Sequence, residues 1–333
     1  MTILVTGGAG YIGSHMVHAL VDNGEPPVVL DNLSTGFRFL IPSAITFVSG
    51  STGDRDLVAK LLQQHRVTEI IHFAASVVVP ESIRDPLAYY RNNTMNTCTL
   101  LDAAVEAGVR HFIFSSTAAV YGNAAGDAPL RETAATSPIS PYGSSKLMSE
   151  IMLHDVGRAH DLRFVVLRYF NVAGADPQLR TGQSTPQATH LIKVACETAL
   201  GRRAKLDVFG TDYPTPDGTC IRDYIHVSDL ARAHLAALAH LRRGGASATF
   251  NCGYGHGHSV FEVVDAVRRA CGREFRVEVA GRRAGDPVSL VADVSRIRST
   301  LDWRPQFDDL DTIVTHALAW ERRLSGKREG AQI

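Results

Sequence analysis

The stretch Gly7-Gly-Ala-Gly10-Tyr-Ile-Gly13 decides the fold of the first half of this chain. It follows an apolar run, Thr2–Thr6, and opens an amphipathic segment, Ile12–Asn23. A strand, a glycine turn and a helix in this order are typical of a dinucleotide-binding unit. Gly7 permits the tight turn, Gly10 lets backbone approach a pyrophosphate, and Gly13 allows close packing of helix and strand. The helix N-terminus then favours the phosphate charge.

The first 170 residues alternate short apolar runs with longer amphipathic ones. We expect strands at Ile3–Thr6, Val28–Asp31, Ile45–Val48, Glu69–Phe73, His111–Ser115 and Phe164–Tyr169. We expect helices at Ile12–Asn23, Arg55–His65, Leu87–Ala107 and Tyr142–His160. This order predicts an α/β fold of the Rossmann type, in which helices cover both faces of a doubly wound parallel sheet. Ligands of such sheets bind beyond the carboxyl ends of the strands.

The pattern changes after about residue 171. Two long loops, Gly174–Ala188 and Gly210–Thr219, are followed by helical segments at Val227–Leu241, Val260–Ala270 and Asp309–Arg322. We expect residues 1–170 to form a NAD-binding domain and residues 171–333 a smaller α/β lobe that binds substrate. Some segments of the second part, such as 222–245, are expected to pack back on the first.

Composition narrows the class of protein. The formal net charge is zero at pH 7, which gives no support to nucleic-acid or membrane-surface binding. No apolar run approaches the roughly 18 residues of a membrane span, and the first residues enter a strand without the basic region of a signal peptide. Five cysteines without C-x-x-C spacing indicate reduced thiols in a cytoplasmic protein rather than a metal site.

Asp31 ends the second expected strand, 18 residues after Gly13. A carboxylate at this place accepts hydrogen bonds from the adenosine ribose of a dinucleotide. It would repel a 2′-phosphate, so the sequence favours NAD over NADP as cofactor.

The phrase Tyr142-Gly-Ser-Ser-Lys146 supplies a candidate reaction centre. Positions i and i+4 share a helix face, so Tyr142 and Lys146 point to one spot. A phenol with a pKa near 10 needs roughly 4 to 5 kcal/mol of stabilisation to act as a base at neutral pH. One cation about 5 Å away gives roughly 3 kcal/mol at an effective dielectric of 20. We therefore expect Lys146 and a positively charged nicotinamide together to lower the pKa of Tyr142.

The G-x-x-G-x-x-G spacing and the Y-x-x-x-K phrase resemble the extended short-chain dehydrogenase/reductase superfamily. Further phrases, in order over residues 2–322, resemble the UDP-glucose 4-epimerase family: His72-Phe-Ala-Ala75, Phe114-Ser-Ser-Thr117, Val120-Tyr-Gly122, Ser140-Pro-Tyr-Gly-Ser-Ser-Lys146, Arg168-Tyr-Phe-Asn171, Gly218-Thr-Cys-Ile-Arg-Asp-Tyr-Ile-His226 and Arg283-Ala-Gly-Asp286. The resemblance implies that UDP-glucose and UDP-galactose are interconverted. Hydride leaves C4 of the sugar and returns to the opposite face of a 4-keto intermediate, with NAD as cofactor.

The resemblance also implies the site residues. The catalytic residues would be Thr117, Tyr142 and Lys146, with the Thr117 hydroxyl on the sugar oxygen. The NAD site would comprise Gly7, Gly10, Tyr11, Ile12, Gly13, Asp31, Asn32, Ser34, Thr35, Gly36, Ser51, Thr52, Phe73, Ala74, Ala75, Asn92, Tyr142, Lys146 and Phe170. The UDP-sugar site would comprise Thr117, Tyr142, Asn171, His190, Leu191, Asp207, Val208, Phe209, Arg222, Tyr224, Arg283, Asp286 and Leu290.

Some of these positions carry a more specific expectation. Arg222 and Arg283 would fork onto pyrophosphate oxygens, because guanidinium matches phosphate geometry. Ser51, Ala75 and Val77 depart from the family pattern, which puts the strength of NAD binding in question. Leu290 stands where the family places a residue near the 2-position of the sugar. Its size predicts a preference for UDP-glucose and UDP-galactose over their N-acetylated forms.

Other functions on this scaffold stay open. A 4,6-dehydratase needs an acid pair directly after the hydroxyl residue, and here Ala118 and Ala119 follow Thr117. Epimerases or decarboxylases of UDP-N-acetylhexosamine, UDP-xylose or UDP-uronic acids are harder to exclude, as is a sugar reductase. A non-catalytic NAD-binding regulator is the rival from another class, although it has no reason to retain Thr117, Tyr142 and Lys146 together.

Self-association is also expected from the resemblance. In relatives, the helices that correspond to Leu87–Ala107 and Tyr142–His160 pair across a two-fold axis. Both segments carry apolar residues at helical spacing, which predicts a homodimer. The residues expected on this surface are Leu87, Tyr90, Leu101, Val105, Leu147, Ile151 and Val156.

Overall fold

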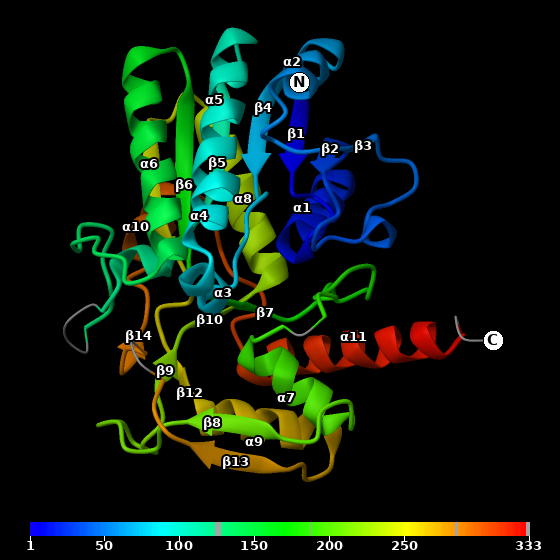
Figure 1. Cartoon of the computed structure of the whole chain (residues 1–333), viewed down its shortest axis with the longest axis vertical. Coiled ribbons are helices and arrows are strands. Elements are labelled where there is room, and N and C mark those ends of the chain that lie inside the picture. The colour runs from blue at the N-terminus through cyan, green and yellow to red at the C-terminus, as the bar shows by residue number, and fades with distance from the viewer. Residues whose placement is uncertain (124–127, 187, 284–285, 331–333) are drawn as a thin grey trace.

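A computed structural model describes residues 1–123, 128–186, 188–283 and 286–330. Seven strands form one sheet in the order β11–β6–β5–β4–β1–β2–β3 (Figure 1). Every neighbouring pair is parallel, which confirms the predicted doubly wound sheet. The strands are β1 (Thr2–Thr6), β2 (Val28–Asp31), β3 (Phe47–Ser49), β4 (Val67–His72), β5 (His111–Thr117), β6 (Arg163–Tyr169) and β11 (Ala248–Cys252).

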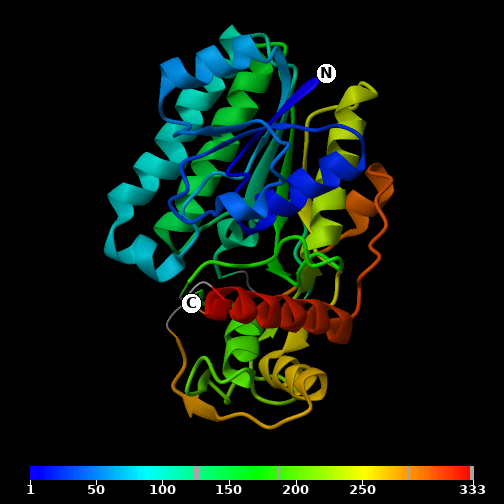
Figure 2. The same ribbon diagram turned by 90° about the vertical axis from the view of Figure 1, so that its right-hand side faces the viewer.

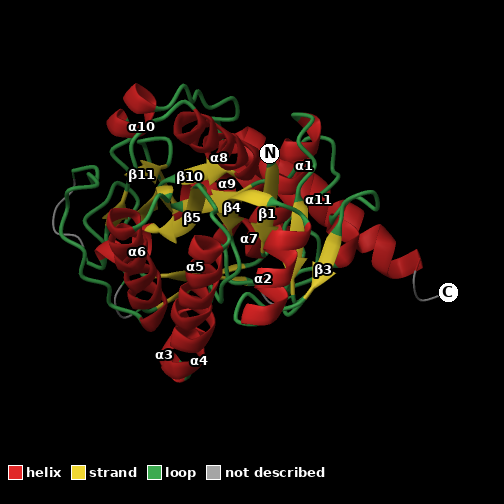
Figure 3. Ribbon diagram, turned by 90° about the horizontal axis from the view of Figure 1, so that it is seen from above, coloured by secondary structure: helices red, strands yellow, loops and turns green. Residues whose placement is uncertain are grey.

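Helices cover both faces of this sheet (Figure 3). The helices α1 (Tyr11–Asp22) and α8 (Val227–Arg242) lie on one face. The helices α2 (Arg55–Gln64), α5 (Asn96–Glu106) and α6 (Pro141–Ala159) lie on the other. The strands consequently bury side chains on both faces, as the adjacent, fully buried Leu4 and Val5 of β1 illustrate. The strand order reverses at β1, because β2 lies on one side of it and β4 lies on the other. We therefore expect the dinucleotide site at this switch point.

The segment Leu87–Ala107 is not the single helix that the sequence predicted. It contains α4 (Pro86–Tyr89), a π-helical turn (Tyr90–Met95) and α5, after a short helix α3 (Val79–Arg84). Asn93 in the π turn is buried and donates to the carbonyl of Ser76 and to the hydroxyl of Ser145, both at 3.0 Å. The wider turn thus accommodates a polar side chain that joins the loop after β4 to α6.

A second lobe lies below the sheet in Figures 1 and 2. It contains the helices α7 (Leu191–Ala199) and α9 (Val260–Cys271), and the parallel strands β8 (Leu206–Phe209) and β13 (Val277–Ala280). The long helix α11 (Leu310–Gly330) packs on α7 and α9, and it runs past the predicted end at Arg322. No helix in the described part of the chain has the length and apolar character that crossing a membrane requires.

Short strands connect the two lobes. The strand β7 (Asn171–Ala173) pairs with β10 (Tyr224–His226), and β9 (Ile221–Arg222) lies between β12 (His258–Ser259) and β14 (Ser289–Leu290). The helix α10 (Ser295–Thr300) follows β14 and packs near β11.

Two elements from beyond residue 171, α8 and β11, belong to the large sheet and its cover. The chain therefore returns to the first lobe after it has entered the second. The buried carboxylate of Glu69 in β4 accepts a hydrogen bond of 2.5 Å from Arg242 of α8, which fixes this return.

Candidate active site

The carboxyl ends of the parallel strands bring the predicted cofactor residues to one edge of the sheet. Gly7 follows β1, Asp31 ends β2, and Phe73 follows β4. Thr117 ends β5, and Phe170 follows β6. Five segments that are far apart in the sequence therefore contribute to one crevice.

The glycine turn leaves no room for side chains. Gly7 has a positive φ of 69°, and a Cβ atom at this position would lie 2.5 Å from the backbone nitrogen of Ala74. A Cβ atom on Gly13 would lie 2.2 Å from the carbonyl oxygen of Gly7. This glycine cradle, followed at once by the N-terminus of α1, fits a dinucleotide pyrophosphate.

Asp31 is buried and organises the loops around the cradle. Its carboxylate oxygens accept hydrogen bonds from the backbone of Ala9 at 2.9 Å and of Leu33 at 2.8 Å. Burial raises its pKa, and these two hydrogen bonds lower it. A carboxylate has about four acceptor positions, so Asp31 retains acceptor capacity for ribose hydroxyls. The predicted loop residues Asn32, Ser34, Thr35 and Gly36 follow directly, and Gly36 packs against the backbone of Ala9.

The other predicted cofactor residues lie around this edge with their own contacts. Tyr11 donates to the carbonyl of Gly174 at 2.7 Å, and Asn92 donates to the hydroxyl of Ser76 at 2.9 Å. The hydroxyl of Ser51 accepts from the backbone of Gly53 at 3.1 Å, which occupies part of its capacity to bind adenine. Thr52 is buried beside it. The remaining members of the predicted set, Ile12, Ala74 and Ala75, belong to α1 and to the loop after β4.

Tyr142 and Thr117 form the centre of the candidate reaction site. Tyr142 lies in the first turn of α6, which Ser140 caps by accepting from the backbone of Gly143. Both Tyr142 and Thr117 are about 9% exposed, so they are nearly enclosed. Burial raises the pKa of Tyr142, and a hydrogen bond with Thr117 lowers it by a smaller amount.

Lys146 lies one turn further along α6 and is buried. Its ammonium group donates to the carbonyl of Ser115 at 2.9 Å and lies 5.0 Å from the centre of the Phe114 ring. Burial lowers its pKa to about 7, against an opposing effect of Glu150. The shift of the Tyr142 pKa in this structure arises from burial and Thr117. The lowering expected from Lys146 and nicotinamide together stays a prediction.

A buried polar network fixes α6. Glu150 accepts three hydrogen bonds from Arg168 of β6, one of 2.6 Å and two of 3.1 Å, and one from the hydroxyl of Ser116. Arg168 also donates to the hydroxyl of Tyr121 at 3.0 Å, and Tyr121 donates to Asn251 at 2.6 Å. The network therefore holds α6 against β5, β6 and β11. The phrases around these residues indicated the family, but nothing in them indicated an ion pair.

His72 and His111 have structural partners. Buried His72 contacts the hydroxyls of Thr6 at 2.6 Å and Thr97 at 2.9 Å. Its burial, aided by the charge of Lys146, lowers its pKa to about 3. His111 contacts Glu69 at 2.9 Å. His111 begins β5, so this contact lies away from the carboxyl ends of the strands.

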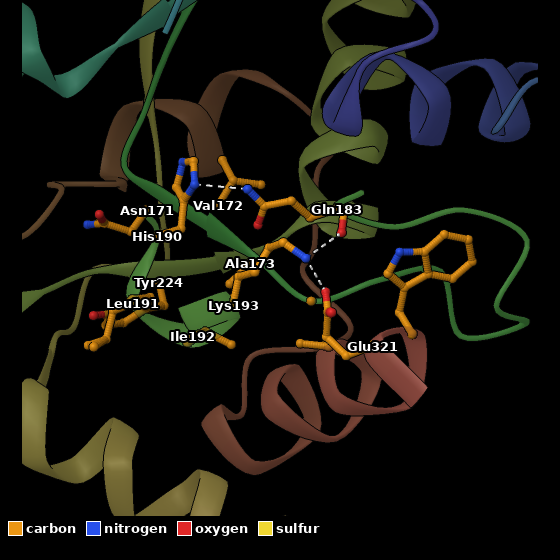
Figure 4. A pocket seen from close by; sticks show the side chains of 13 residues that line it. Asn171, Val172, Ala173, Gln183, His190, Leu191, Ile192, Lys193, Tyr224 and Glu321 are labelled. Carbon is orange, nitrogen blue, oxygen red and sulfur yellow. Dashed lines mark hydrogen bonds and ion pairs between the residues drawn. The ribbon is translucent and has the colours of Figure 1, made fainter. Parts of the chain in front are cut away.

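A cavity of about 50 Å3 lies between β7, α7 and α11 (Figure 4). Four predicted substrate residues line it, namely Asn171, His190, Leu191 and Tyr224. Asn171 and Tyr224 are paired in register on β7 and β10, whereas His190 and Leu191 begin α7. The wall also contains Gln183, Lys193 and Glu321, which the sequence analysis missed. Lys193 and Glu321 pair across 128 positions, a separation that local patterns do not reveal.

The remaining predicted substrate residues lie on the strands β8, β9 and β14 and in the segment between β13 and β14. The guanidinium of Arg283 stacks 3.8 Å from the centre of the Phe209 ring. Arg222 donates to the carbonyl of Pro287 at 2.9 Å and lies 3.5 Å from Asp286. Leu290 is half-buried and pairs in register with Arg222, through β14 and β9. On β8, Val208 is buried, while Asp207 lies 2.9 Å from Lys205. Residues 284 and 285 of the Arg283–Asp286 phrase lie outside the described residues.

The apolar surface on the paired helices differs from the predicted one. Leu101 is buried in the core, and Val105, Val156 and Leu147 pack against the core. Leu87 and Ile151 are exposed, as predicted, and Ile83, Met95 and Met148 are further exposed apolar residues in this region. The prediction was wrong for the buried positions because one face of each helix covers the sheet, which periodicity alone does not distinguish.

Comparison with known proteins agrees with this geometry. Residues 3–253 match the model of the NAD dependent epimerase/dehydratase family. The UDP-glucose 4-epimerase of Azospirillum brasilense is 60% identical over 322 residues, which cover 97% of this chain and 92% of the relative. The crystal structure of UDP-glucose 4-epimerase from Brucella ovis in complex with NAD has a TM-score of 0.93 at 45% identity, covering 96% and 97% of the two chains.

A third relative has a wider substrate range in its name. The UDP-Glc/GlcNAc 4-epimerase of Campylobacter jejuni has a TM-score of 0.85 at 48% identity, covering 97% of this chain and 99% of that one. Family model, sequence identity and fold thus agree along nearly the whole chain, and the resemblance stated from the motifs is confirmed. This chain belongs to the NAD dependent epimerase/dehydratase family and, within it, to the UDP-glucose 4-epimerase group.

Proposed function

We propose that this protein interconverts UDP-glucose and UDP-galactose, with NAD as its cofactor. The observation that carries the proposal is the pair of enclosed hydroxyls of Thr117 and Tyr142 at the strand edge that bears the glycine cradle. The proton acceptor and the dinucleotide site face the same crevice, as a reaction at a sugar carbon that bears a hydroxyl group requires. The relatives in the same group carry the activity in their names.

NAD held by the glycine turn and Asp31 would supply hydride transfer to and from C4 of the sugar. Tyr142 takes the proton of the 4-hydroxyl and later gives it back. Thr117 binds the sugar oxygen and relays this proton through its hydrogen bond with Tyr142. Lys146, at the base of the site, would hold the nicotinamide ribose. The enclosure of these groups keeps bulk water from the reacting carbon.

The second lobe holds the nucleotide. Asn171, His190 and the first backbone N–H groups of α7 face the cavity and suit diphosphate oxygens. Arg222 and Arg283 add charge-assisted donors from the neighbouring strands. Phe209 offers a ring face to the uracil. Leu290 limits the space beside the sugar, so we propose that N-acetylated UDP-sugars are poorer substrates.

The test is to incubate the purified protein with UDP-galactose and no added cofactor. We expect UDP-glucose to form until the two sugars reach equilibrium, and NAD to be released when the protein is denatured. Chromatography of the nucleotide sugars measures the first result, and enzymatic NAD determination the second. A protein that carries NAD but leaves UDP-galactose, UDP-xylose and UDP-uronic acids unchanged would overturn the proposal in favour of a NAD-binding regulator.

We further propose a homodimer, formed by the exposed residues Leu87, Met95, Met148 and Ile151 of the paired helices and by Ile83 of the neighbouring α3. A cytoplasmic location is proposed on the five cysteines, all of which are unpaired. The division into a NAD-binding part and a substrate-binding part near residue 170 is proposed with one exception, because α8 and β11 belong to the large sheet.

A further inference from the structure

Gln183 and His190 form a side-chain pair on the wall of the cavity (Figure 4). The amide nitrogen of Gln183 lies 2.9 Å from Nδ1 of His190. With the amide in this orientation its nitrogen donates and Nδ1 accepts, which corresponds to the neutral ring with its proton on Nε2. Nε2 has no partner among the described residues. His190 lines the cavity and thus offers one N–H donor there.

Lys193 fixes this pair from behind. Its ammonium is buried and donates to the carbonyl of Gln183 at 3.1 Å (Figure 4). Two carboxylates hold the ammonium in place: Glu321 of α11 in direct contact and Glu197 of α7 at 3.2 Å. The backbone of Gln183 is consequently tied to two helices, and its amide has a defined position in front of His190.

The charges around His190 oppose its protonation. Its partial removal from water in the cleft lowers its pKa first, and the ammonium of Lys193 lowers it further. The carboxylates of Glu321 and Glu197 face Lys193 rather than the imidazole, and Tyr224 of β10 contributes only a buried phenol to the same cavity. A neutral ring is therefore the stable form at physiological pH.

We propose that Gln183 is a positioning residue that fixes His190 as a neutral imidazole with its proton on Nε2, so that this N–H donates to the diphosphate of the nucleotide sugar. The inference rests on the proposed function for the identity of the ligand. It adds a residue without substrate contact to the binding site. A neutral donor keeps the affinity for the nucleotide steady where an imidazolium would make it vary with pH.

The decisive variant is Gln183→Glu. Above the pKa of His190, the new carboxylate accepts from Nδ1, so the proton moves to Nδ1 and Nε2 can no longer donate to the ligand. Below it, the imidazolium donates from both nitrogens and binding recovers. A carboxylate at this distance raises the pKa of a histidine by about 1 to 3 units, which brings the transition into the range of the experiment.

Calorimetric titration with UDP at pH 6, 7 and 8 gives the readout. The Kd of the variant is divided by that of the unmutated protein at each pH. This ratio is free of the effect that ionisation of the terminal phosphate of UDP has on both Kd values. We expect this ratio to be about tenfold at pH 8 and to fall severalfold by pH 6, since one lost hydrogen bond to a charged group costs about 1.5 kcal/mol or more. A ratio that does not change with pH overturns the proposal.

Two matched variants separate tautomer control from simple damage. Gln183→Leu removes the hydrogen bond without adding charge, so we expect weaker binding with a ratio that stays constant from pH 6 to 8. Ser184→Ala changes a buried neighbour that donates only to the carbonyl of Gly182 at 3.2 Å, and it should bind UDP normally at every pH. Equal behaviour of all three variants would show that the loop, and not Gln183, matters.

Nitrogen-15 spectra of the unmutated protein test the tautomer even where a variant fails to fold. Two-bond couplings of labelled histidine should report a proton on Nε2 of His190, and a proton on Nδ1 overturns the inference. Failure of the proposed function looks different. In that case the unmutated protein does not bind UDP at any pH, whereas UDP binding with a constant ratio removes only the role of Gln183.

Discussion

The ammonium group of Lys146 donates a hydrogen bond of 2.9 Å to the backbone carbonyl of Ser115, two residues before Thr117 on the same strand. This contact ties the first turns of α6 to the end of β5, so the two hydroxyls of the site keep their relative position. The positive charges expected to lower the pKa of Tyr142 during catalysis are those of Lys146 and the nicotinamide ring.

Tyr142→Phe should lower turnover by about 100- to 10,000-fold, because the proton acceptor is removed while the ring is kept. The rate of UDP-glucose formation and the NAD content per subunit should be measured together. Tyr89→Phe is a suitable control, since the ring of Tyr89 lies 6.5 Å from that of Tyr142 and its hydroxyl bonds only to Val78 and Glu81. Near-normal turnover of the Tyr142 variant would refute the assignment.

Asp31→Asn should weaken retention of NAD by about tenfold, because the variant loses a charged acceptor for the ribose hydroxyls. It should also narrow the preference for NAD over NADP, since the repulsion of a 2′-phosphate is removed. Asp31 also accepts hydrogen bonds from the backbone of Ala9 and Leu33, so the substitution can affect the fold of these loops. The unfolding temperature of the variant must therefore be recorded. Unchanged retention of NAD in a folded variant would contradict the role of this carboxylate.

Leu290→Ser should admit UDP-N-acetylglucosamine more readily. A contact of methylene size discriminates by about 1–3 kcal/mol, so the unmutated protein should prefer UDP-glucose by roughly 10- to 200-fold in kcat/KM, and the variant by much less. Val291→Ser is the control, because Val291 faces the other side of the strand, toward Gly257. Comparable turnover of both sugars by the unmutated protein would show that Leu290 does not limit the pocket.

Ile151→Asp should convert the expected dimer to monomer. Ile151 is 53% exposed on α6, and a carboxylate in the middle of an apolar interface would be buried without a partner. Light scattering at micromolar concentration gives the mass directly. The same charge introduced on another helix, as Gln63→Asp on α2, should leave the mass unchanged. If the unmutated protein is monomeric, the interface proposal fails.

His72 should make stability depend on pH in the acid range. Its pKa of about 3 in the folded protein lies below the ordinary value of 6.5, so the unfolded chain binds more protons between these values. The free energy of unfolding should therefore fall as pH decreases from 6.5 toward 4, by at most about 1.4 kcal/mol per pH unit for this group. In His72→Gln the slope, measured by urea unfolding, should be smaller. An identical slope would assign the effect to other groups.

The sequence predicted six of the seven strands of the large sheet because they are short apolar runs bounded by turns, and β2 was predicted to the residue. The edge strand β11 was not predicted, because its segment Ala248–Cys252 mixes apolar and polar residues. It also predicted the glycine turn and the face shared by Tyr142 and Lys146, which depend on local geometry. The π turn at Tyr90–Met95 was missed, since it depends on the tertiary contacts of buried Asn93. The ion pairs of Glu150 with Arg168 and of Lys193 with Glu321 were not predicted for the same reason.

The return of the chain to the large sheet has a consequence for synthesis. The edge strand β11 is made some 80 residues after its neighbour β6, once the first half of the second lobe has left the ribosome. Until then β6 has an open edge, and its apolar residues Val165 and Leu167 lack the cover that α8 and β11 provide in the final structure. We expect the nascent chain to need protection from aggregation during this interval, because long-range parallel pairing forms slowly.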